Sequence, residues 1–285
     1  MTIREALAQA YADLKFAGIE TPGLDASLLL SHVLQISRTE LYSRTGRLTQ
    51  KACEQLCGLI ERRCSGECTA YLTGKKEFMG LEFNVNNSVL VPRPDTETLV
   101  EAAMETIRNN LHNNESINVL DLCTGSAAVA VALKHEMPQI KVHASDISAQ
   151  ALDTARANAD RLLPGKNIHF HSGDLYDALS SIKCSFNLVI SNPPYISTDE
   201  IQTLSAEVQN EPRIALDGGK SGLEVIKRII NDTPRHLQKN GWLLLEADPR
   251  QMKNIQKLLE KRGFKNVKLS KDLSGQDRVI GGEFG

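Results

Sequence analysis

The chain has 285 residues, a formal net charge of -2 and a hydrophobic fraction of 41%. The near-neutral charge excludes a whole-chain basic field that would draw the protein onto nucleic acid or an anionic membrane. No apolar run approaches the roughly 20 residues needed to span a bilayer, and the N-terminus lacks a signal or transit pattern. We therefore expect a cytoplasmic protein without a membrane partner.

The first seventy or so residues are typical of helices. Thr2 and Glu5 form a capping-box pattern at the start of the chain. Apolar residues recur at helical spacing over 7–14 and 26–34, and a third helix is expected to begin near Thr49. We predict a small helical domain over residues 1–72.

Four of the six cysteines fall close together, which raises the question of a metal site. Their spacing is not the C-x2-C of zinc sites, and no histidine lies nearby. We expect Cys53, Cys57 and Cys64 to share a buried helical face with Leu56 and Ile60. The sequence thus predicts core packing and no metal.

In residues 73–91 the spacing of apolar residues changes from a helical period to alternation. Two short alternating runs separated by Gly80 indicate a β-hairpin that links two domains. From residue 92 to the C-terminus, strands and helices alternate, which predicts an α/β fold with a doubly wound, mainly parallel sheet. The last two strands are expected to pair antiparallel at one edge. The predicted strands are 117–122, 140–145, 167–172, 186–191, 241–247, 266–270 and 277–282.

A small-residue turn follows the first strand of this sheet, after Asp121. Such a turn is where doubly wound sheets bind nucleotide-like ligands. Measured against G-x-G-x-x-G it offers Cys123, Gly125 and Ala128, so the motif is weak, and an ordinary strand-to-helix turn stays open. A helix is expected to begin near Ala127.

Two later strands end in acidic residues at the same edge. Asp146 lies about 20 residues after the loop, the separation at which an acid reaches the ribose hydroxyls of a nucleoside. Asp174 and Leu175 follow the third strand. A dinucleotide needs glycines against its pyrophosphate, whereas S-adenosylmethionine has no phosphate and tolerates small side chains such as Cys123. The methyl donor is therefore favoured.

The run Asn192–Tyr195, "NPPY", directly follows the fourth strand. Two prolines cannot continue the sheet ladder, so the strand should end at Ser191 and pass into a rigid loop. The Asn192 side-chain carbonyl and the Pro193 backbone carbonyl can accept both hydrogens of a planar NH2 group. This would localise the nitrogen lone pair and orient it toward a sulfonium methyl. Tyr195 is expected to form a wall of the pocket and offer its ring to the cation.

Together these stretches resemble the HemK/PrmC family, the protein-(glutamine-N5) methyltransferases that modify peptide chain release factors. The resemblance is carried by NPPY, by "VLDLCTGSAAVAVAL", and by "VPRPDTETLVE", "EPRIALDGGKSGLEVIKRII" and "KDLSGQDRVIGG". It implies a seven-stranded class I methyltransferase domain over 92–285. The helical domain over 1–72 would recognise the substrate, with the hairpin over 73–91 as linker.

The resemblance also implies the ligands and the site. The donor would be S-adenosylmethionine, the product S-adenosylhomocysteine, and the acceptor the glutamine of the Gly-Gly-Gln motif in class I release factors, an activity that tunes translation termination. A monomer without direct nucleic-acid binding is expected. Asn192, Pro193 and Tyr195 would be catalytic. The cofactor would contact Asp121, Cys123, Thr124, Gly125, Ser126, Ala127, Asp146, Ile147, Asp174, Leu175 and Asn192. The substrate would contact Arg93, Pro94, Glu97, Asn192, Pro193, Pro194 and Tyr195.

The chain departs from the family pattern at two positions. Ala127 stands where the family usually has glycine, and Cys68 where it usually has proline. Ala127 is expected to crowd the methionine end of the cofactor. The fold is not put in doubt.

Other functions stay open at this point. Methylation of a glutamine in a ribosomal protein would use the same chemistry. DNA or RNA amino-methyltransferases, acting on adenine N6, cytosine N4 or guanine N2, pose the same lone-pair problem but need basic grooves. A non-catalytic module that keeps S-adenosylmethionine as a structural ligand is the remaining alternative.

Overall fold

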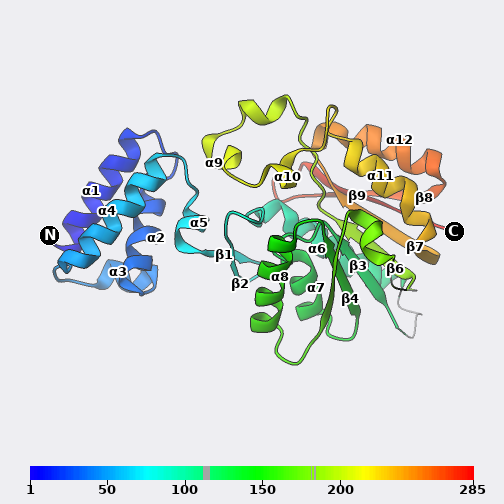
Figure 1. The fold of residues 1–285 in the computed structure, drawn as a ribbon, viewed down its shortest axis with the longest axis horizontal. Coiled ribbons are helices and arrows are strands. Elements are labelled where there is room, and N and C mark those ends of the chain that lie inside the picture. Colours follow the sequence, from blue (N-terminus) through cyan, green and yellow to red (C-terminus); the bar gives the residue numbers. More distant parts are fainter. Residues whose placement is uncertain (112–115, 181, 183) are drawn as a thin grey trace. The chain divides into compact units, whose positions relative to one another are not determined.

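The computed structural model describes residues 1–111, 116–180, 182 and 184–285. The chain forms two compact units (Figure 1). The first comprises Met1–Lys75 and Ser205–Asn210, and the second comprises Lys76–Leu204 and Glu211–Gly285. Three roles stay predictions: substrate recognition by residues 1–72, a linker over 73–91 and a methyltransferase domain over 92–285. Within the described ranges, no helix is both long and apolar enough to cross a bilayer.

The first unit is helical. The Thr2 hydroxyl accepts a hydrogen bond from Glu5 N, and the Glu5 carboxylate accepts one from Thr2 N, which completes the predicted capping box. The Thr49 hydroxyl caps the third predicted helix by accepting a hydrogen bond from Ala52 N. Three short helices of this unit were not predicted. The helices are α1 (Ile3–Phe16), α2 (Pro22–Leu34), α3 (Arg38–Ser43), α4 (Gln50–Cys64), α5 (Thr69–Thr73) and, from the second segment, α9 (Ala206–Gln209).

The expected burial of the cysteines is wrong. Cys57 and Cys64 are exposed and Cys53 is half-buried. The face of α4 that packs inward carries Ala52, Leu56, Ile60 and Arg63. Each of these three cysteines lies one position after a buried residue, and one position is about 100° around a helix. Among the described residues, no group of three or more His, Cys, Asp or Glu is arranged to hold a metal ion.

A buried ion pair lies inside the first unit. The Arg63 guanidinium donates from Nε to Asp25 Oδ2 at 2.7 Å, and both side chains are almost fully buried. Arg63 also pairs with Glu207, and Asn210 Nδ2 donates to the Gly66 carbonyl at 2.9 Å. The segment Ser205–Asn210 is thereby tied to α4.

The predicted hairpin opens the second unit. Strands β1 (Lys75–Phe78) and β2 (Leu81–Asn84) are joined by Met79 and Gly80. Both turn residues have positive φ, 50° and 71°, as the two-residue turns favoured in hairpins require. The rings of Phe78 and Phe83 pack edge to face, with their centroids 6.1 Å apart.

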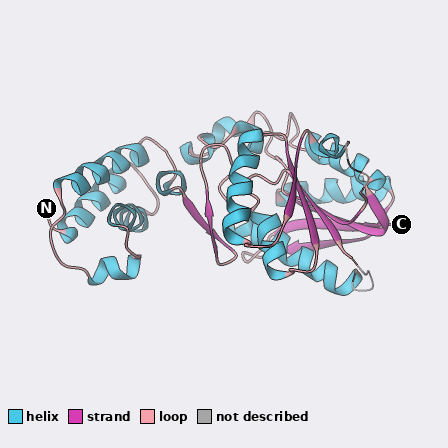
Figure 2. Ribbon diagram, turned by 60° about the horizontal axis from the view of Figure 1, so that its bottom comes forward, coloured by secondary structure: helices cyan, strands magenta, loops and turns pink. Residues whose placement is uncertain are grey.

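The second unit is built on a seven-stranded sheet in the order β5-β4-β3-β6-β7-β9-β8, which confirms the predicted α/β fold and its antiparallel edge (Figure 2). The other pairs are parallel. Its strands are β3 (Asn118–Leu122), β4 (Lys141–Asp146), β5 (Ile168–Ser172), β6 (Phe186–Ser191), β7 (Leu237–Glu246), β8 (Phe264–Lys271) and β9 (Asp277–Phe284).

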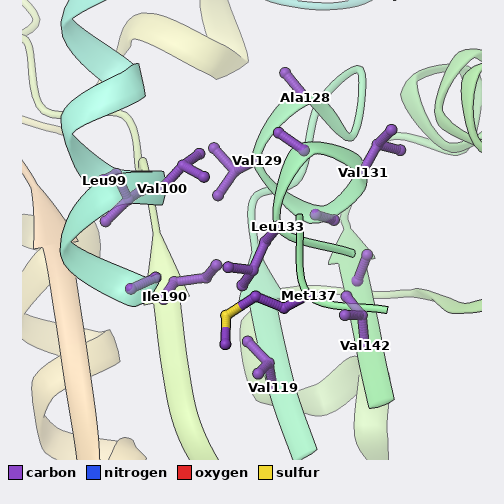
Figure 3. Packing of buried hydrophobic residues seen from close by; sticks show 14 of the residues in the cluster. Leu99, Val100, Val119, Ala128, Val129, Val131, Leu133, Met137, Val142 and Ile190 are labelled. Atoms are coloured by element: carbon purple, nitrogen blue, oxygen red, sulfur yellow. The ribbon is translucent and has the colours of Figure 1, made fainter. Parts of the chain in front are cut away.

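Helices cover both faces of this sheet, because its strands are apolar on both sides. α6, α7 and α8 pack on one face with Val119, Ile190 and Leu244, as Figure 3 shows for part of this cluster. α11 and α12 pack on the other with Leu120 and Val189. The helices are α6 (Glu97–Asn110), α7 (Ala128–Glu136), α8 (Ala149–Leu162), α10 (Arg213–Leu216), α11 (Glu224–Asp232) and α12 (Met252–Arg262).

Asn158 on α8 connects the hairpin to the loop after β3. Its side chain is fully buried and forms three hydrogen bonds. Oδ1 accepts from Asn84 N at 2.8 Å, and Nδ2 donates to the carbonyls of Asn84 and Ser126 at 3.0 and 3.1 Å. One side chain therefore fixes two segments that are distant in sequence.

We expect Asn158→Ala to lower the free energy of unfolding by about 2–3 kcal/mol, because it leaves the buried Ser126 carbonyl and two half-buried backbone groups of Asn84 unpaired. Urea unfolding followed by circular dichroism measures the change. Asn109→Ala, which removes an exposed and long hydrogen bond, is the matched control and should change stability by less than about 0.5 kcal/mol. Equal losses in both variants would contradict the assigned role of Asn158.

Candidate active site

A cavity of about 730 Å³ opens at the carboxyl ends of the parallel strands of the second unit. Its walls come from the segment after the hairpin, from the loops after β3, β4, β5 and β6, and from α10 to α11. The lining includes Ser88, Val89, Arg93, Thr96, Asp121, Cys123–Ser126, Asp146, Ile147, Asp174, Leu175, Asn192, Pro194, Arg213, Ile214, Asp217 and Arg228. Carboxyl edges are where open α/β sheets bind ligands.

In the loop after β3, every second residue from Cys123 to Ala127 has a left-handed backbone conformation. Cys123, Gly125 and Ala127 have φ of 59°, 55° and 62°, which is unfavourable for a residue with a Cβ atom. Ala127 is fully buried at the N-terminus of α7 and, in the described structure, does not line the cavity. Its predicted contact with the cofactor is therefore not seen, because the methyl group points into the core.

Cys123 does line the cavity. Burial, helped by the negative charge of Asp146, raises the pKa of its thiol to about 12. The thiol is therefore neutral at physiological pH. It acts as a small, weakly polar wall and not as a nucleophile.

Two carboxylates shape the floor of the cavity. Asp121 Oδ2 accepts a hydrogen bond from the Thr124 hydroxyl at 2.6 Å, and burial raises the pKa of Asp121 to about 7. Asp146 accepts from Gly125 N and Ser148 N, both at 2.9 Å, and its pKa is also raised by burial. Asp146 thus holds two cavity loops together by direct backbone contacts.

The remaining predicted cofactor residues lie along the same wall. Asp174 forms an ion pair with Arg228 at 2.7 Å, and both line the cavity. Leu175 is buried with φ 50°, whereas Ile147 is about half exposed. The structure thus brings every predicted cofactor residue except Ala127 to one cavity.

Asn192 follows β6 at the predicted place, and the Ser191 hydroxyl donates to the Leu122 carbonyl at 2.7 Å. The Asn192 side chain lines the cavity, and its Nδ2 donates to Thr96 Oγ1 at 3.2 Å. Because Nδ2 is directed at Thr96, Oδ1 is left as an acceptor. Pro194 also lines the cavity.

Pro193 and Tyr195 do not line the cavity in the described structure. The Tyr195 ring packs against the core on the α11 and α12 face. Burial, helped by the negative charge of Glu246, raises the pKa of its hydroxyl well above the ordinary value. The ring therefore does not form the wall that the sequence predicted. Its role against a bound cation stays a prediction.

The predicted substrate residues near the hairpin divide into two groups. Arg93 lines the cavity and pairs with the buried carboxylate of Glu211, which also accepts from Val91 N at 3.1 Å. Pro94 and Glu97 do not line it in the described structure. Glu97 Oε1 instead accepts from Met79 N at 2.9 Å, so this side chain fixes the hairpin turn.

Sequence reasoning missed the wall formed by residues 213–228. Gly218 N donates a hydrogen bond to the Ile196 carbonyl at 2.8 Å, and a Cβ atom at Gly218 would lie 2.7 Å from the Pro194 carbonyl. Glycine is thus required where this segment packs on the NPPY loop. The signal was present in "ALDGGKSG", whose paired glycines lie outside any regular element.

Two family models match this chain. Residues 5–74 match the PrmC N-terminal domain and residues 97–219 the methyltransferase small domain. The release factor glutamine methyltransferase of Rhodopirellula baltica is 38% identical over 92% of this chain and 90% of that protein. The protein of the same name from Moorella thermoacetica is 37% identical over 98% of both. The chain belongs to the release factor glutamine methyltransferase family.

Solved structures agree on the fold. A methyltransferase from Pyrococcus furiosus has a TM-score of 0.52 at 19% identity, covering 72% of this chain and 90% of that one. The human methyltransferase 10 domain containing protein has a TM-score of 0.53 at 16% identity, covering 73% and 90%. This family member therefore has the predicted class I methyltransferase fold.

We expect the contribution of Asp121 and Glu246 to the free energy of unfolding to fall between about pH 4 and pH 7. Burial raises the pKa values of these two carboxyls to about 7 from 3.8 and 4.5. Over this window the two groups bind more protons in the folded state than in the unfolded state, so their contribution declines as pH rises and levels off above about 7. The partly buried histidines, whose pKa values are lowered, contribute in the opposite direction and are unchanged by a substitution at Asp121.

Asp121→Asn should make this decline shallower, because the amide does not titrate. Urea unfolding at a series of pH values measures the slope. The exposed Asp160→Asn variant serves as control and should keep the wild-type slope. Identical slopes for wild type and Asp121→Asn would contradict the assigned burial effect.

Proposed function

We propose that this protein transfers a methyl group from S-adenosylmethionine to the side-chain amide nitrogen of the glutamine in the Gly-Gly-Gln motif of class I peptide chain release factors. The observation that carries the proposal is the Asn192 carboxamide at the cavity wall, with Nδ2 held by Thr96 and Oδ1 left to accept. Membership in a family whose curated relatives bear this name supports it.

The cavity suits S-adenosylmethionine better than a dinucleotide. The loop after β3 offers Gly125 as its single glycine and presents no G-x-G-x-x-G cradle for a pyrophosphate. Five acidic and three arginine side chains line the described cavity, an excess that favours a sulfonium cation. Asp146 would accept the ribose hydroxyls, and Cys123–Ser126 would lie against the methionine part.

The proposed chemistry is direct displacement. Asn192 Oδ1 and the Pro193 carbonyl would each accept one amide hydrogen, so the nitrogen lone pair leaves conjugation with the glutamine carbonyl. The nitrogen attacks the methyl carbon, the carbon–sulfur bond breaks toward sulfur, and S-adenosylhomocysteine is released. The extra proton on nitrogen passes to water. Fixed acceptors supply orientation and stabilise the positive charge that develops.

Three further expectations from the sequence belong to this proposal. Recognition of the release factor by residues 1–72, a monomeric state and a cytoplasmic location stay predictions. A net charge of -2 does not favour a nucleic-acid substrate. A ribosomal protein is the alternative acceptor with the same chemistry.

We expect Asn192→Ala to reduce methyl transfer by a factor on the order of 100 or more, because one preorganised acceptor is lost, while S-adenosylmethionine still binds. Mass spectrometry of a purified release factor incubated with enzyme and donor should show one added methyl on the Gly-Gly-Gln glutamine. Ribosomal protein and duplex DNA in parallel reactions test the alternatives. Undiminished methylation by Asn192→Ala would refute the assigned role.

We expect Asp146→Ala to weaken S-adenosylmethionine binding by roughly 10- to 100-fold, since it removes a charged acceptor of hydrogen bonds. Isothermal titration calorimetry measures the dissociation constant. Asp153→Ala, an exposed substitution on α8 outside the cavity lining, is the control. Equal affinity in both variants would remove Asp146 from the cofactor site.

A further inference from the structure

The order of the strands assigns the parts of the proposed cofactor to different places along the cavity. The strands β6, β3, β4 and β5 lie side by side in that order. Asn192 follows β6, the loop Cys123–Ser126 follows β3, and Asp146 ends β4. With the reacting methyl at Asn192 and the ribose at Asp146, a cofactor laid along this edge of the sheet places its base beyond Asp146, at the end of β5.

Asp174 brings a carboxylate to the cavity at this place. The backbone on both sides of it is tightly constrained. Gly173 has φ 154°, a Cβ atom there would lie 2.7 Å from Ala178 Cα, and Gly173 N donates to the Asp146 carbonyl at 3.0 Å. Leu175 has φ 50° and is buried in the hydrophobic cluster under α11. The place of the Asp174 carboxylate therefore depends on the conformation of its side chain.

Arg228 on α11 fixes that side chain. Its Nη2 donates to Asp174 Oδ2 at 2.7 Å, and both residues line the cavity. α11 lies next to this segment because Ile226 and Ile229 share a hydrophobic cluster with Leu175. The guanidinium engages Oδ2, so within the described part of the chain Oδ1 is left to accept a hydrogen bond from a ligand.

A role in folding does not explain this ion pair. The Asp174 side chain is 42% exposed and that of Arg228 is 51% exposed, and ion pairs as exposed as this one contribute little to stability. A base bound against Oδ1 would cover the pair and exclude water, and charges interact more strongly where water is excluded. The ion pair therefore matters most when the cavity is occupied.

The chemistry of Oδ1 selects between purine bases. An ionised carboxylate accepts hydrogen bonds and cannot donate one. It therefore binds a base that offers an amine at this edge, as adenine does, and repels a base with a carbonyl oxygen there, as in hypoxanthine. Such discrimination needs a carboxylate that keeps its place, because a side chain free to rotate would turn away from the wrong base and lose little.

We propose that Arg228 is a positioning residue for the cofactor, which holds the Asp174 carboxylate with Oδ1 toward the amine of the base and so sets a preference for adenine over hypoxanthine. This inference rests on the proposed function, because it takes S-adenosylmethionine as the ligand of the cavity. Arg228 acts through Asp174 and does not contact the base in this scheme. The preference is thus controlled by a residue that lies 54 positions further along the chain.

The test measures dissociation constants for S-adenosylhomocysteine and its hypoxanthine analogue, S-inosylhomocysteine, by isothermal titration calorimetry. We expect the wild type to prefer the adenine form roughly 100-fold, and Arg228→Met, which keeps the apolar stem and removes the donors, to prefer it about tenfold or less. Arg228→Lys should restore most of the preference. Arg235→Met, at an arginine paired with Asp232 outside the cavity lining, should keep the wild-type ratio.

Asp174→Asn supplies an independent variant, because its amide can turn an oxygen toward adenine or an NH2 group toward hypoxanthine. We expect its preference for adenine to fall to about twofold or less. A wild-type ratio in Arg228→Met overturns the inference, as does an equal loss of affinity for both ligands, which a merely structural role would produce. Should Arg228→Met not fold, a wild-type ratio in Asp174→Asn overturns it.

Failure of the proposed function would look different in the same experiment. A wild-type protein that binds neither ligand would overturn the proposed function, and this inference with it. A wild-type protein that binds both ligands equally would overturn this inference alone. Neither readout depends on the identity of the methyl acceptor.

Discussion

The parallel pairing of β3 with β6 in the middle of the sheet is the constraint on which the site depends. Val119 is paired with Leu188 and Leu122 with Ser191, so both strands end at the same level. The loop that begins at Cys123 and the loop that begins at Asn192 consequently leave the sheet side by side. A shift of one residue in this register would also exchange the faces of every side chain on β6. The sheet register therefore brings the donor loop and the acceptor amide together, and the contacts of Gly125 with Asp146 and of Asn192 with Thr96 hold them there.

Local signals in the sequence predicted most of the fold correctly. The capping box of α1, the end of β6 before two prolines, and the apolar strands depend on residues that are close together in the chain. The residues predicted to bind the cofactor lie at strand ends or in the loops that follow, which is why all of them except Ala127 meet at one cavity. These features need no knowledge of distant partners.

Side-chain directions were harder to predict, because they depend on neighbours remote in sequence. Tyr195 was expected in the cavity wall, but its ring packs against the hydrophobic cluster under α11 and α12. Glu97 was expected near the substrate, but its carboxylate accepts a hydrogen bond from the Met79 backbone amide in the hairpin turn. Cys57 and Cys64 were assigned to the buried face of α4, but each lies one position away from it. The sequence pattern does not show this, because a charged residue, Arg63, takes one of the buried positions.

The membership of Ser205–Asn210 in the first unit has a consequence for dissecting the molecule. The chain leaves the second unit after Leu204 and returns to it at Glu211, so no single cut divides the protein into its two compact bodies. A fragment starting after Lys75 would retain Glu207 and Asn210 without Arg63 and Gly66. The next residue, Glu211, binds Val91 N and Arg93 at the cavity, so removal of the N-terminal residues would free the segment Ser205–Asn210 directly before a residue that supports the cavity wall.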